Sequence, residues 1–130
     1  MAKESASMQR MIKVLVADNQ PRARNSMRAL LSTWSLVGEV RQADNGREAL
    51  DLVREFRPDV VLMDVRMPEM DGLEATVQIK ALWPQVKVVV LSMYPENQSD
   101  ALAAGADAFV SKADAPRDLL GILAAIVGEV

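Results

Sequence analysis

Nearly continuous apolar runs alternate along this chain with segments that place their apolar residues on one helical face. Three long runs, residues 11–17, 60–63 and 86–91, and a brief one, residues 108–110, each end on polar side chains. Runs of this kind are typical of strands buried on both faces of a parallel sheet. A further run, residues 37–43, mixes polar and apolar positions, as edge strands do.

Helical spacing of apolar residues fills the intervals between these runs. It predicts helices over residues 21–34, 46–56, 73–82, 97–104 and 116–127. Pro21 and Pro116 suit the first turn of a helix, and Asn45 and Asp71 suit N-cap positions. Glu48, three residues after Asn45, completes a capping box. The helix starts therefore carry their own local signals.

The segment 97–104 differs from the other predicted helices in how little it can bury. Its inner face is mostly alanine, with Leu102 as its one large apolar residue. Small side chains remove little apolar surface from water, so they stabilise a helix weakly. We expect this helix to be the least stable of the five and the easiest to displace.

Strands that alternate with helices require right-handed crossovers and a parallel sheet covered on both faces. The most apolar runs belong at the centre of that sheet, and the mixed run 37–43 belongs at its edge. The pattern therefore predicts an α/β fold: a flavodoxin-like (βα)5 doubly wound parallel sheet with strand order 2-1-3-4-5. We expect one domain over residues 11–130, preceded by a flexible N-terminal tail, residues 1–10.

The composition limits the chemistry that this fold can carry. The chain has 130 residues, a net charge of -3, and neither cysteine nor histidine. These absences exclude disulfides, thiol or imidazole catalysis and zinc sites built from Cys or His. No basic stripe with interleaved aromatic residues is present, so we expect no nucleic-acid binding by this chain alone. The apolar runs are too short to span a membrane, and a reducing cytoplasm is the natural setting.

The predicted strands end on polar residues that the strand order brings together. In that order the first and third strands are adjacent at the topological switch point, which places Asp18, Asn19 and Asp64 side by side. Two carboxylates and an amide oxygen attract a hard divalent cation, and we favour Mg²⁺. Lys112 and Ser92 lie opposite and are suited to hold the oxygens of a phosphoryl group.

Asp64 is suited to act as a nucleophile in this arrangement. Its carboxylate is ionised at neutral pH and needs no general base, which fits a chain without histidine. With a metal neutralising charge, Asp64 can attack phosphorus in line and become an acyl phosphate. Two structural alternatives remain: Asp18 and Asn19 as caps of the helix that Pro21 opens, and Asp64 as a turn residue.

A family resemblance appears once these residues are taken with Phe109. Asp18, Asp64 in the stretch Val-Leu-Met-Asp-Val-Arg-Met-Pro-Glu-Met-Asp-Gly, Ser92, Phe109 and Lys112 together resemble the receiver domain of bacterial two-component response regulators, which has the CheY-like fold. The resemblance covers about residues 11–127, nearly the whole chain. The chain is therefore identified as a member of a signal-transduction family that relays phosphoryl groups.

The resemblance implies a role for each matching residue. A sensor histidine kinase is expected to phosphorylate Asp64, so the chain is a phosphoacceptor that takes part in its own phosphorylation and dephosphorylation rather than an enzyme with turnover. Asp18 and the backbone carbonyl of Arg66 help to hold Mg²⁺, and Lys112 and Ser92 bind the phosphoryl oxygens. Phe109 matches an aromatic switch position that turns inward as Ser92 moves toward the phosphate.

The stretches 91–96 and 104–109 are most similar to the NarL/LuxR branch of the family. Receivers of that branch usually precede a helix-turn-helix DNA-binding domain and so serve transcription regulation. No such output domain is present in this chain. We expect a receiver cut at the linker, with a stand-alone receiver as the alternative.

Asn19 departs from the family pattern, which usually has a second acid there as a direct metal ligand. An amide oxygen still coordinates, but one negative charge is lost, so affinity for Mg²⁺ should fall. The alternative function is therefore a pseudo-receiver, a protein-interaction module with weakened metal binding. Two further classes fit less well: a flavodoxin-like carrier, whose phosphate Asp18 would repel, and an aspartate phosphatase, which needs an acid where Arg66 stands.

Two expectations concern the surroundings of the site. Arg66 and Tyr94 flank it on either side, and we expect their bulk to control access of water to the acyl phosphate. The weakly packed helix 97–104 and the strand 108–110 are expected to form the responding surface. A homodimer through the face between the fourth and fifth helices is the interaction we expect there.

Overall fold

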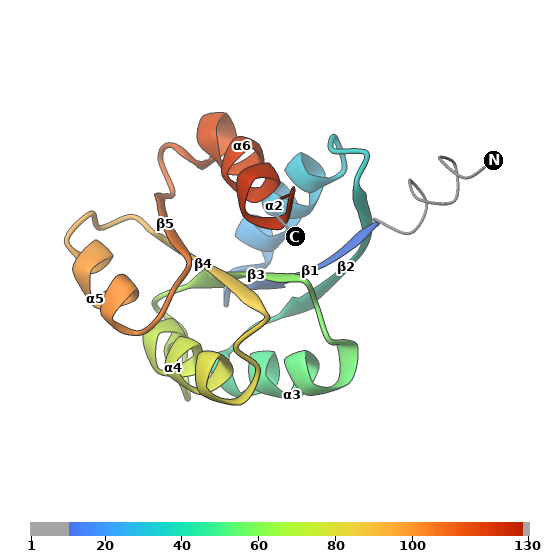
Figure 1. Ribbon diagram of the computed structural model, residues 1–130. Coiled ribbons are helices and arrows are strands. Elements are labelled where there is room, and N and C mark those ends of the chain that lie inside the picture. Colours follow the sequence, from blue (N-terminus) through green and yellow to red (C-terminus); the bar gives the residue numbers. More distant parts are fainter. Residues whose placement is uncertain (1–10, 129–130) are drawn as a thin grey trace.

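A single parallel sheet forms the centre of the molecule (Figure 1). The computed structural model describes residues 11–128, so the predicted tail 1–10 lies outside the described residues. All pairings are parallel, and the strand order is β2-β1-β3-β4-β5. The strands are β1 (Ile12–Ala17), β2 (Val37–Ala43), β3 (Val60–Asp64), β4 (Lys87–Ser92) and β5 (Ala108–Ser111). The predicted fold and strand order are confirmed.

Helices cover both faces of the sheet and create two separate cores. They are α2 (Pro21–Leu31), α3 (Gly46–Phe56), α4 (Gly72–Leu82), α5 (Asn97–Ala103) and α6 (Ala115–Gly128). Figure 1 shows α2 and α6 on one face and α3 and α4 on the other. The first core packs residues such as Leu31 and Leu123 against Leu62, and the second packs Val53 and Ile79 against Met63. Alternate residues of β3 thus serve opposite cores.

Local signals set the helix starts as the sequence predicts. The Asn45 side chain accepts a hydrogen bond from the Glu48 backbone N–H, and Glu48 in turn accepts one from the backbone N–H of Asp44. Asp71 caps α4 in the same way through the backbone N–H of Glu74. Such caps satisfy backbone donors that the first helical turn leaves unpaired.

Three details of the helices differ from the prediction. Helix α2 ends at Leu31, and Trp34 lies in the turn that follows while still packing against the core. Val77 and Leu102 have the right spacing for an apolar face but are 51% and 50% exposed. In α5 the buried residue is Ala101. The expectation that Leu102 lies on an inner face is therefore wrong, and α5 buries even less than predicted.

No helix within residues 11–128 is long and apolar enough to cross a bilayer.

Candidate functional site

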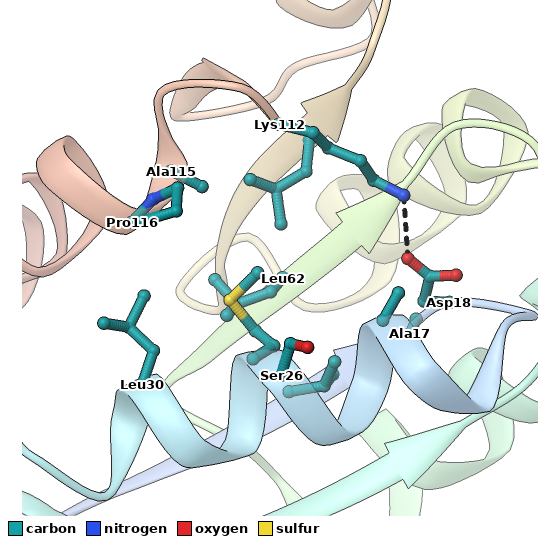
Figure 2. Close-up of a pocket in the computed structure, with 12 residues that line it drawn as sticks. Ala17, Asp18, Ser26, Leu30, Leu62, Lys112, Ala115 and Pro116 are labelled. Carbon is teal, nitrogen blue, oxygen red and sulfur yellow. Dashed lines mark hydrogen bonds and ion pairs between the residues drawn. The ribbon is translucent and has the colours of Figure 1, made fainter.

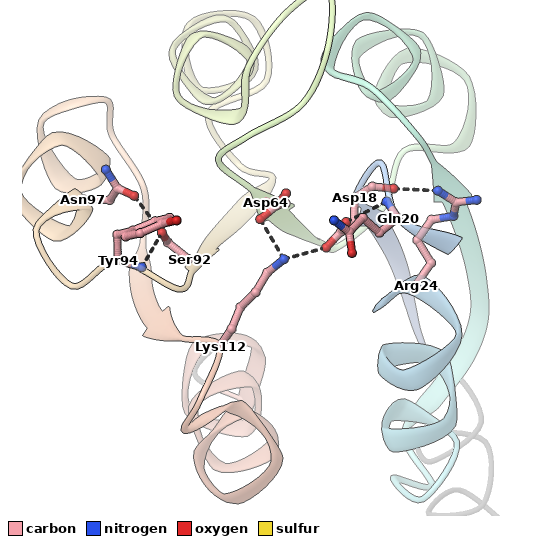
Figure 3. A network of polar contacts seen from close by, with 8 residues as sticks. All are labelled: Asp18, Gln20, Arg24, Asp64, Ser92, Tyr94, Asn97 and Lys112. Carbon is pink, nitrogen blue, oxygen red and sulfur yellow. Dashed lines mark hydrogen bonds and ion pairs between the residues drawn. The ribbon is translucent and has the colours of Figure 1, made fainter. Parts of the chain in front are cut away.

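Four polar side chains gather where the strands reach their carboxyl ends. Asp18 follows β1, Asp64 ends β3, Ser92 ends β4, and Lys112 follows β5. Parallel strands place all these ends on one edge of the sheet, and β1 and β3 are neighbours at its switch point. Figure 3 shows Asp18 and Asp64 on either side of the Lys112 ammonium group. The sequence-predicted site residues are thus brought together.

Lys112 bridges the two carboxylates. Its Nζ lies 2.9 Å from Oδ2 of Asp18 and 2.9 Å from Oδ1 of Asp64. Both acids are buried, with Asp64 only 8% exposed. Two carboxylates this close repel each other, so a cation between them is required for both to stay ionised. In the structure described here, that cation is the lysine side chain.

Burial and neighbouring charges together shift the pKa values of Asp64 and Lys112. Burial raises the pKa of Asp64 above its ordinary value, the charge of Asp18 raises it further, and the hydrogen bond and charge of Lys112 only partly offset this. For Lys112, burial works against the charged form, yet hydrogen bonds and charges from Asp64 and Asp18 outweigh it and raise its pKa. Lys112 therefore stays protonated at neutral pH.

Asp18 is held from three directions. Its backbone N–H donates to the Ala43 carbonyl at 3.0 Å, and its Oδ1 accepts from the Gln20 backbone N–H at 2.9 Å. Arg24 on α2 donates through Nη1 to the Asp18 backbone carbonyl at 2.6 Å, and its Nε donates to Gln42 Oε1 at 3.0 Å. These bonds connect β1, β2 and α2 around one residue, so the carboxylate has a fixed direction; Figure 3 shows the bonds from Gln20 and Arg24.

Ser92 is also fully engaged. Its side chain is buried, and its hydroxyl donates to Oδ1 of Asn97 at 2.6 Å while accepting from the Tyr94 backbone N–H at 3.0 Å. The Lys112 backbone N–H donates to the Ser92 carbonyl at 2.8 Å. The ends of β4 and β5 are thereby tied together beside Asp64.

The loop after Asp64 depends on a glycine for its close packing. The Gly72 backbone N–H donates to the Val65 carbonyl at 2.8 Å. A Cβ at Gly72 would lie only 1.9 Å from the Asp64 carbonyl oxygen. Glycine is thus required where α4 begins against the end of β3, because any larger side chain would push the Asp64 backbone away.

A cavity of about 260 Å³ opens over these residues. The lining residues are Asn19, Gln20, Asp64, Arg66, Ser92, Met93, Tyr94 and Lys112. The Arg66 guanidinium lies 4.4 Å from the centre of the Tyr94 ring, so the two side chains stack at its rim. A phosphodonor or water can reach Asp64 through this cavity. Arg66 and Tyr94 lie at its rim, where their side chains can narrow the entrance.

A second cavity, also about 260 Å³, lies behind Asp18 between α2 and α6. Its apolar walls include Leu30, Leu62 and Ala115, and Figure 2 shows Lys112 and Asp18 at one end. The lysine–aspartate pair thus separates a polar cavity from an apolar one.

The residues at the polar cavity fit a hard metal ion. Asp64 and Asn19 line the cavity, and Asp18 contacts Lys112 beside it; the chain has neither cysteine nor histidine to offer a thiolate or an imidazole. Oxygen ligands of this kind suit Mg²⁺. Within residues 11–128, no three Asp, Glu, His or Cys side chains are grouped so that they could hold a metal ion by themselves.

Phe109 lies on β5, three residues before Lys112. It pairs with Val90 in the sheet and packs, partly buried, against the core that contains Ala101. Phe109 thus contacts both β4 and the core beneath α5, so a movement of either element would change its packing. The switching role itself stays a prediction.

Three residues at the site were not predicted from the sequence. Arg24 and Gln42 hold the Asp18 loop, and Asn97 holds Ser92. Arg24 and Gln42 show no signal in the sequence, because a polar residue on an amphipathic segment is ordinarily solvated. Asn97 does carry one, since asparagine at a helix start often hydrogen-bonds the preceding loop.

This fold and site define a response regulator receiver domain. The family model for that domain matches residues 14–124, so the chain belongs to the family. Receiver domains of this family are phosphorylated by sensor histidine kinases and generally bind Mg²⁺ in the acidic pocket. The resemblance inferred from the sequence is confirmed.

Individual relatives place the chain near the NarL and LuxR types. It is 39% identical over 110 residues to the response regulator protein VraR of Staphylococcus aureus, covering 83% of this chain and 53% of that protein. The chain thus spans about half the length of the curated relatives it matches.

Solved structures agree with this placement. A LuxR-family two-component response regulator from Aurantimonas superposes with a TM-score of 0.86 at 28% identity, covering 92% of this chain and 86% of that one. The receiver domain of the response regulator NarL from Mycobacterium tuberculosis gives 0.84 at 29%, covering 92% and 98%. A DNA-binding LuxR-family regulator from Staphylococcus aureus gives 0.83 at 26%, covering 89% and 98%.

Proposed function

We propose that this chain receives a phosphoryl group on Asp64 from a sensor histidine kinase and so switches a surface that controls an output domain. One observation carries the proposal: Lys112 contacts both Asp18 and Asp64 at 2.9 Å beside a cavity that Ser92 also lines. The site offers a nucleophile, a cation and a hydroxyl donor within one cavity. These are the groups that phosphoryl transfer to a carboxylate requires.

The proposed reaction is an in-line displacement. An Asp64 carboxylate oxygen attacks phosphorus and forms the acyl phosphate bond as the P–N bond of the donor phosphohistidine breaks. The electron pair of that bond leaves with the imidazole nitrogen of the kinase. Lys112 and Ser92 then hold phosphoryl oxygens, and Lys112 offsets part of the charge of about -1.5 to -2 that a phosphoryl group brings.

Asp18, Asn19, Asp64 and the Arg66 backbone carbonyl are the groups that we propose hold Mg²⁺. The ion would neutralise charge on the attacking carboxylate and the phosphoryl oxygens. The fixed direction of the Asp18 carboxylate, set by Gln20 and Arg24, supports this assignment. Because the Lys112 side chain now lies between Asp18 and Asp64, it would have to move for an ion to bind there.

The experiment that tests the proposal is intact-mass measurement after incubation with Mg²⁺ and acetyl phosphate. We expect the parent chain to gain one phosphoryl group and the Asp64→Asn variant to gain none. A variant of an exposed acid far from the site, Glu55→Gln, is the matched control and should behave as the parent does. Equal labelling of Asp64→Asn and parent would show that another residue is the acceptor.

Asn19 supports a second candidate, a pseudo-receiver that binds partner proteins without phosphorylation. Only two acidic side chains, Asp18 and Asp64, meet at the site within the described residues. If the parent chain gains no phosphoryl group even at high Mg²⁺ while Asn19→Asp does, this candidate replaces the first.

The response is proposed to run through Ser92 and Phe109 to the face made by α5, β5 and α6. Helix α5 buries only Ala101, and Phe109 packs against the same core, so this region moves at low free-energy cost. The same face is the proposed homodimer surface. By analogy with the LuxR-type relatives, the output is proposed to be DNA binding in the cytoplasm.

Arg66 and Tyr94 are proposed to shield the acyl phosphate. Their stacked side chains line the cavity over Asp64, and removing either opens a path for water. We expect Arg66→Ala and Tyr94→Ala to hydrolyse the acyl phosphate faster than the parent in an intact-mass time course. Leu82→Ala, at an exposed position on α4, is the control. Unchanged lifetimes in both cavity variants would exclude shielding.

A further inference from the structure

The Ser92 hydroxyl has its single hydrogen committed to Asn97. The oxygen atoms Oγ of Ser92 and Oδ1 of Asn97 are 2.6 Å apart (Figure 3). That separation is typical of an O–H···O bond and shorter than an N–H···O bond, so the amide oxygen faces Ser92. A serine hydroxyl carries one donor hydrogen. While this bond persists, Ser92 has no hydrogen to offer a phosphoryl oxygen.

The position of Asn97 sets it apart from its neighbours. It is the first residue of α5, and it is half-buried where Met93 to Glu96 and Gln98 are exposed. Its side chain turns back toward the end of β4 rather than out to solvent (Figure 3). The bond to Ser92 therefore joins the start of a weakly packed helix to a residue of the candidate site.

We propose that Asn97 is a positioning residue that restrains Ser92 in the unphosphorylated chain, through what we term the Ser92–Asn97 latch. The inference rests on the proposed function, because the phosphoryl oxygens are what compete with Asn97 for the hydroxyl hydrogen. Ser92 releases Asn97 when it turns to the phosphoryl group. Phosphorylation and the latch therefore exclude each other.

Opening the latch loosens α5 at its first turn. Glu96, which precedes the helix, makes no side-chain cap, and Ala101 is the buried residue of the helix. Ala101 belongs to the core against which Phe109 packs. Loss of the Asn97 bond thus removes a polar restraint from the same element that the aromatic residue contacts. The Ser92–Asn97 bond therefore links the phosphorylation site directly to the proposed responding face of α5, β5 and α6.

Removing the latch should favour the phosphoryl-bound arrangement. A state that must break a hydrogen bond to bind is penalised by the free energy of that bond, so Asn97→Ala lifts the penalty. A net hydrogen bond of ordinary strength corresponds to a change of roughly threefold to tenfold in a dissociation constant. Asn97→Ala should therefore bind a phosphoryl mimic about that much more tightly than the parent.

The test uses beryllofluoride with Mg²⁺ as the mimic, and titrates ¹⁵N-labelled chain by NMR. The variants are Asn97→Ala, Asn97→Asp, which keeps an acceptor oxygen, and Gln98→Ala as the exposed neighbour control. We expect tighter binding for Asn97→Ala only. In ligand-free chain, amide hydrogen exchange at the start of α5 should quicken in Asn97→Ala and in Ser92→Ala alike.

A double-mutant comparison separates the latch from a general weakening of α5. If Asn97 acts through the serine hydroxyl, Asn97→Ala should change beryllofluoride affinity in the parent and have no effect in the Ser92→Ala background. Tightening that persists without the Ser92 hydroxyl overturns the latch. So does an unchanged affinity in Asn97→Ala when the parent binds beryllofluoride normally.

The same experiments keep the two proposals distinct. A parent chain that gains a phosphoryl group on Asp64 and binds beryllofluoride, yet shows no response to Asn97→Ala, retains the proposed function and loses the latch. A parent chain that neither gains the phosphoryl group nor binds the mimic loses both.

Discussion

Asp64 is an acid whose charge the folded protein tolerates poorly. Its pKa is raised above the ordinary value of 3.8 by burial and by Asp18, with Lys112 offsetting only part of the effect. A raised folded-state pKa means that the folded chain binds the proton more tightly than the unfolded chain does. Stability is then present at low pH and lost as the pH rises through the folded-state pKa.

The sign of that shift gives the first prediction. In Mg²⁺-free buffer at pH 7, Asp64→Asn should unfold at a higher temperature than the parent, because the variant removes a destabilising charge. The advantage should shrink as the pH falls through the raised pKa of Asp64, because the parent then takes up a proton on that carboxylate. Thermal unfolding at several pH values measures this, with Glu55→Gln as control. A variant less stable than the parent at pH 7 would contradict the direction of the shift.

At position 19, adding a single negative charge should change the affinity of the site for Mg²⁺. Replacing it by Asp restores a third carboxylate beside Asp18 and Asp64, so Mg²⁺ affinity should rise on the order of tenfold, or about 1.4 kcal/mol. Calorimetric titration measures the affinity. Gln20→Glu adds the same charge one residue further along the cavity and is the control. Equal gains in both variants would mean that overall charge, rather than coordination by residue 19, sets the affinity.

At the scale of elements, the joint between β3 and α4 is set by Gly72. A Cβ there would meet the Asp64 carbonyl oxygen at 1.9 Å and Cγ of Met63 at 2.9 Å. We expect Gly72→Ala to reduce the free energy of unfolding by at least about 2 kcal/mol, because the clash involves backbone that has no room to move. Urea unfolding followed by tryptophan fluorescence measures it.

Gly121 provides the opposite case in the same chain. It lies in the exposed part of α6, and a Cβ there would meet nothing within 4 Å. Alanine restricts the unfolded chain and favours helix, so Gly121→Ala should stabilise by about 0.5 to 1 kcal/mol. If both glycine variants shift stability in the same direction, close packing does not explain the need for Gly72.

The same elements show what could be learned from sequence. Strand ends and helix caps were predictable at Asp18, Asn45 and Asp64, since apolar runs and cap residues are local signals. The degree of burial of each residue was not predictable, because apolar spacing indicates which side of a helix faces inward but not how much of that side the neighbouring elements cover. Leu102 was expected to lie inward and is half exposed. Contacts such as Asn97 to Ser92 depend on how a loop closes, which periodicity does not encode.

Across the whole molecule, the elements differ in how many buried residues they contain. This difference predicts which elements unfold locally most often. All five residues of β3 are buried, whereas α2 and α5 each have one buried residue, Leu31 and Ala101. Amide hydrogen exchange should therefore be slowest in β3 and β4, and faster in α2 and α5 than in α3 and α6. Mass-resolved exchange measures this. Equal protection of α5 and α3 would contradict the proposal that α5 moves easily.

The bridge made by Lys112 has a consequence for how a donor arrives. Around the polar cavity, the carboxylates of Asp18 and Asp64 are matched by the cations of Lys112 and Arg66, so the formal charges cancel. These four groups therefore neither attract nor repel an anionic donor on balance in the metal-free chain, so we expect them to make its encounter rate only weakly dependent on ionic strength. Long-range steering is weak here, which leaves recognition of the donor to shape and short-range contacts at the cavity rim.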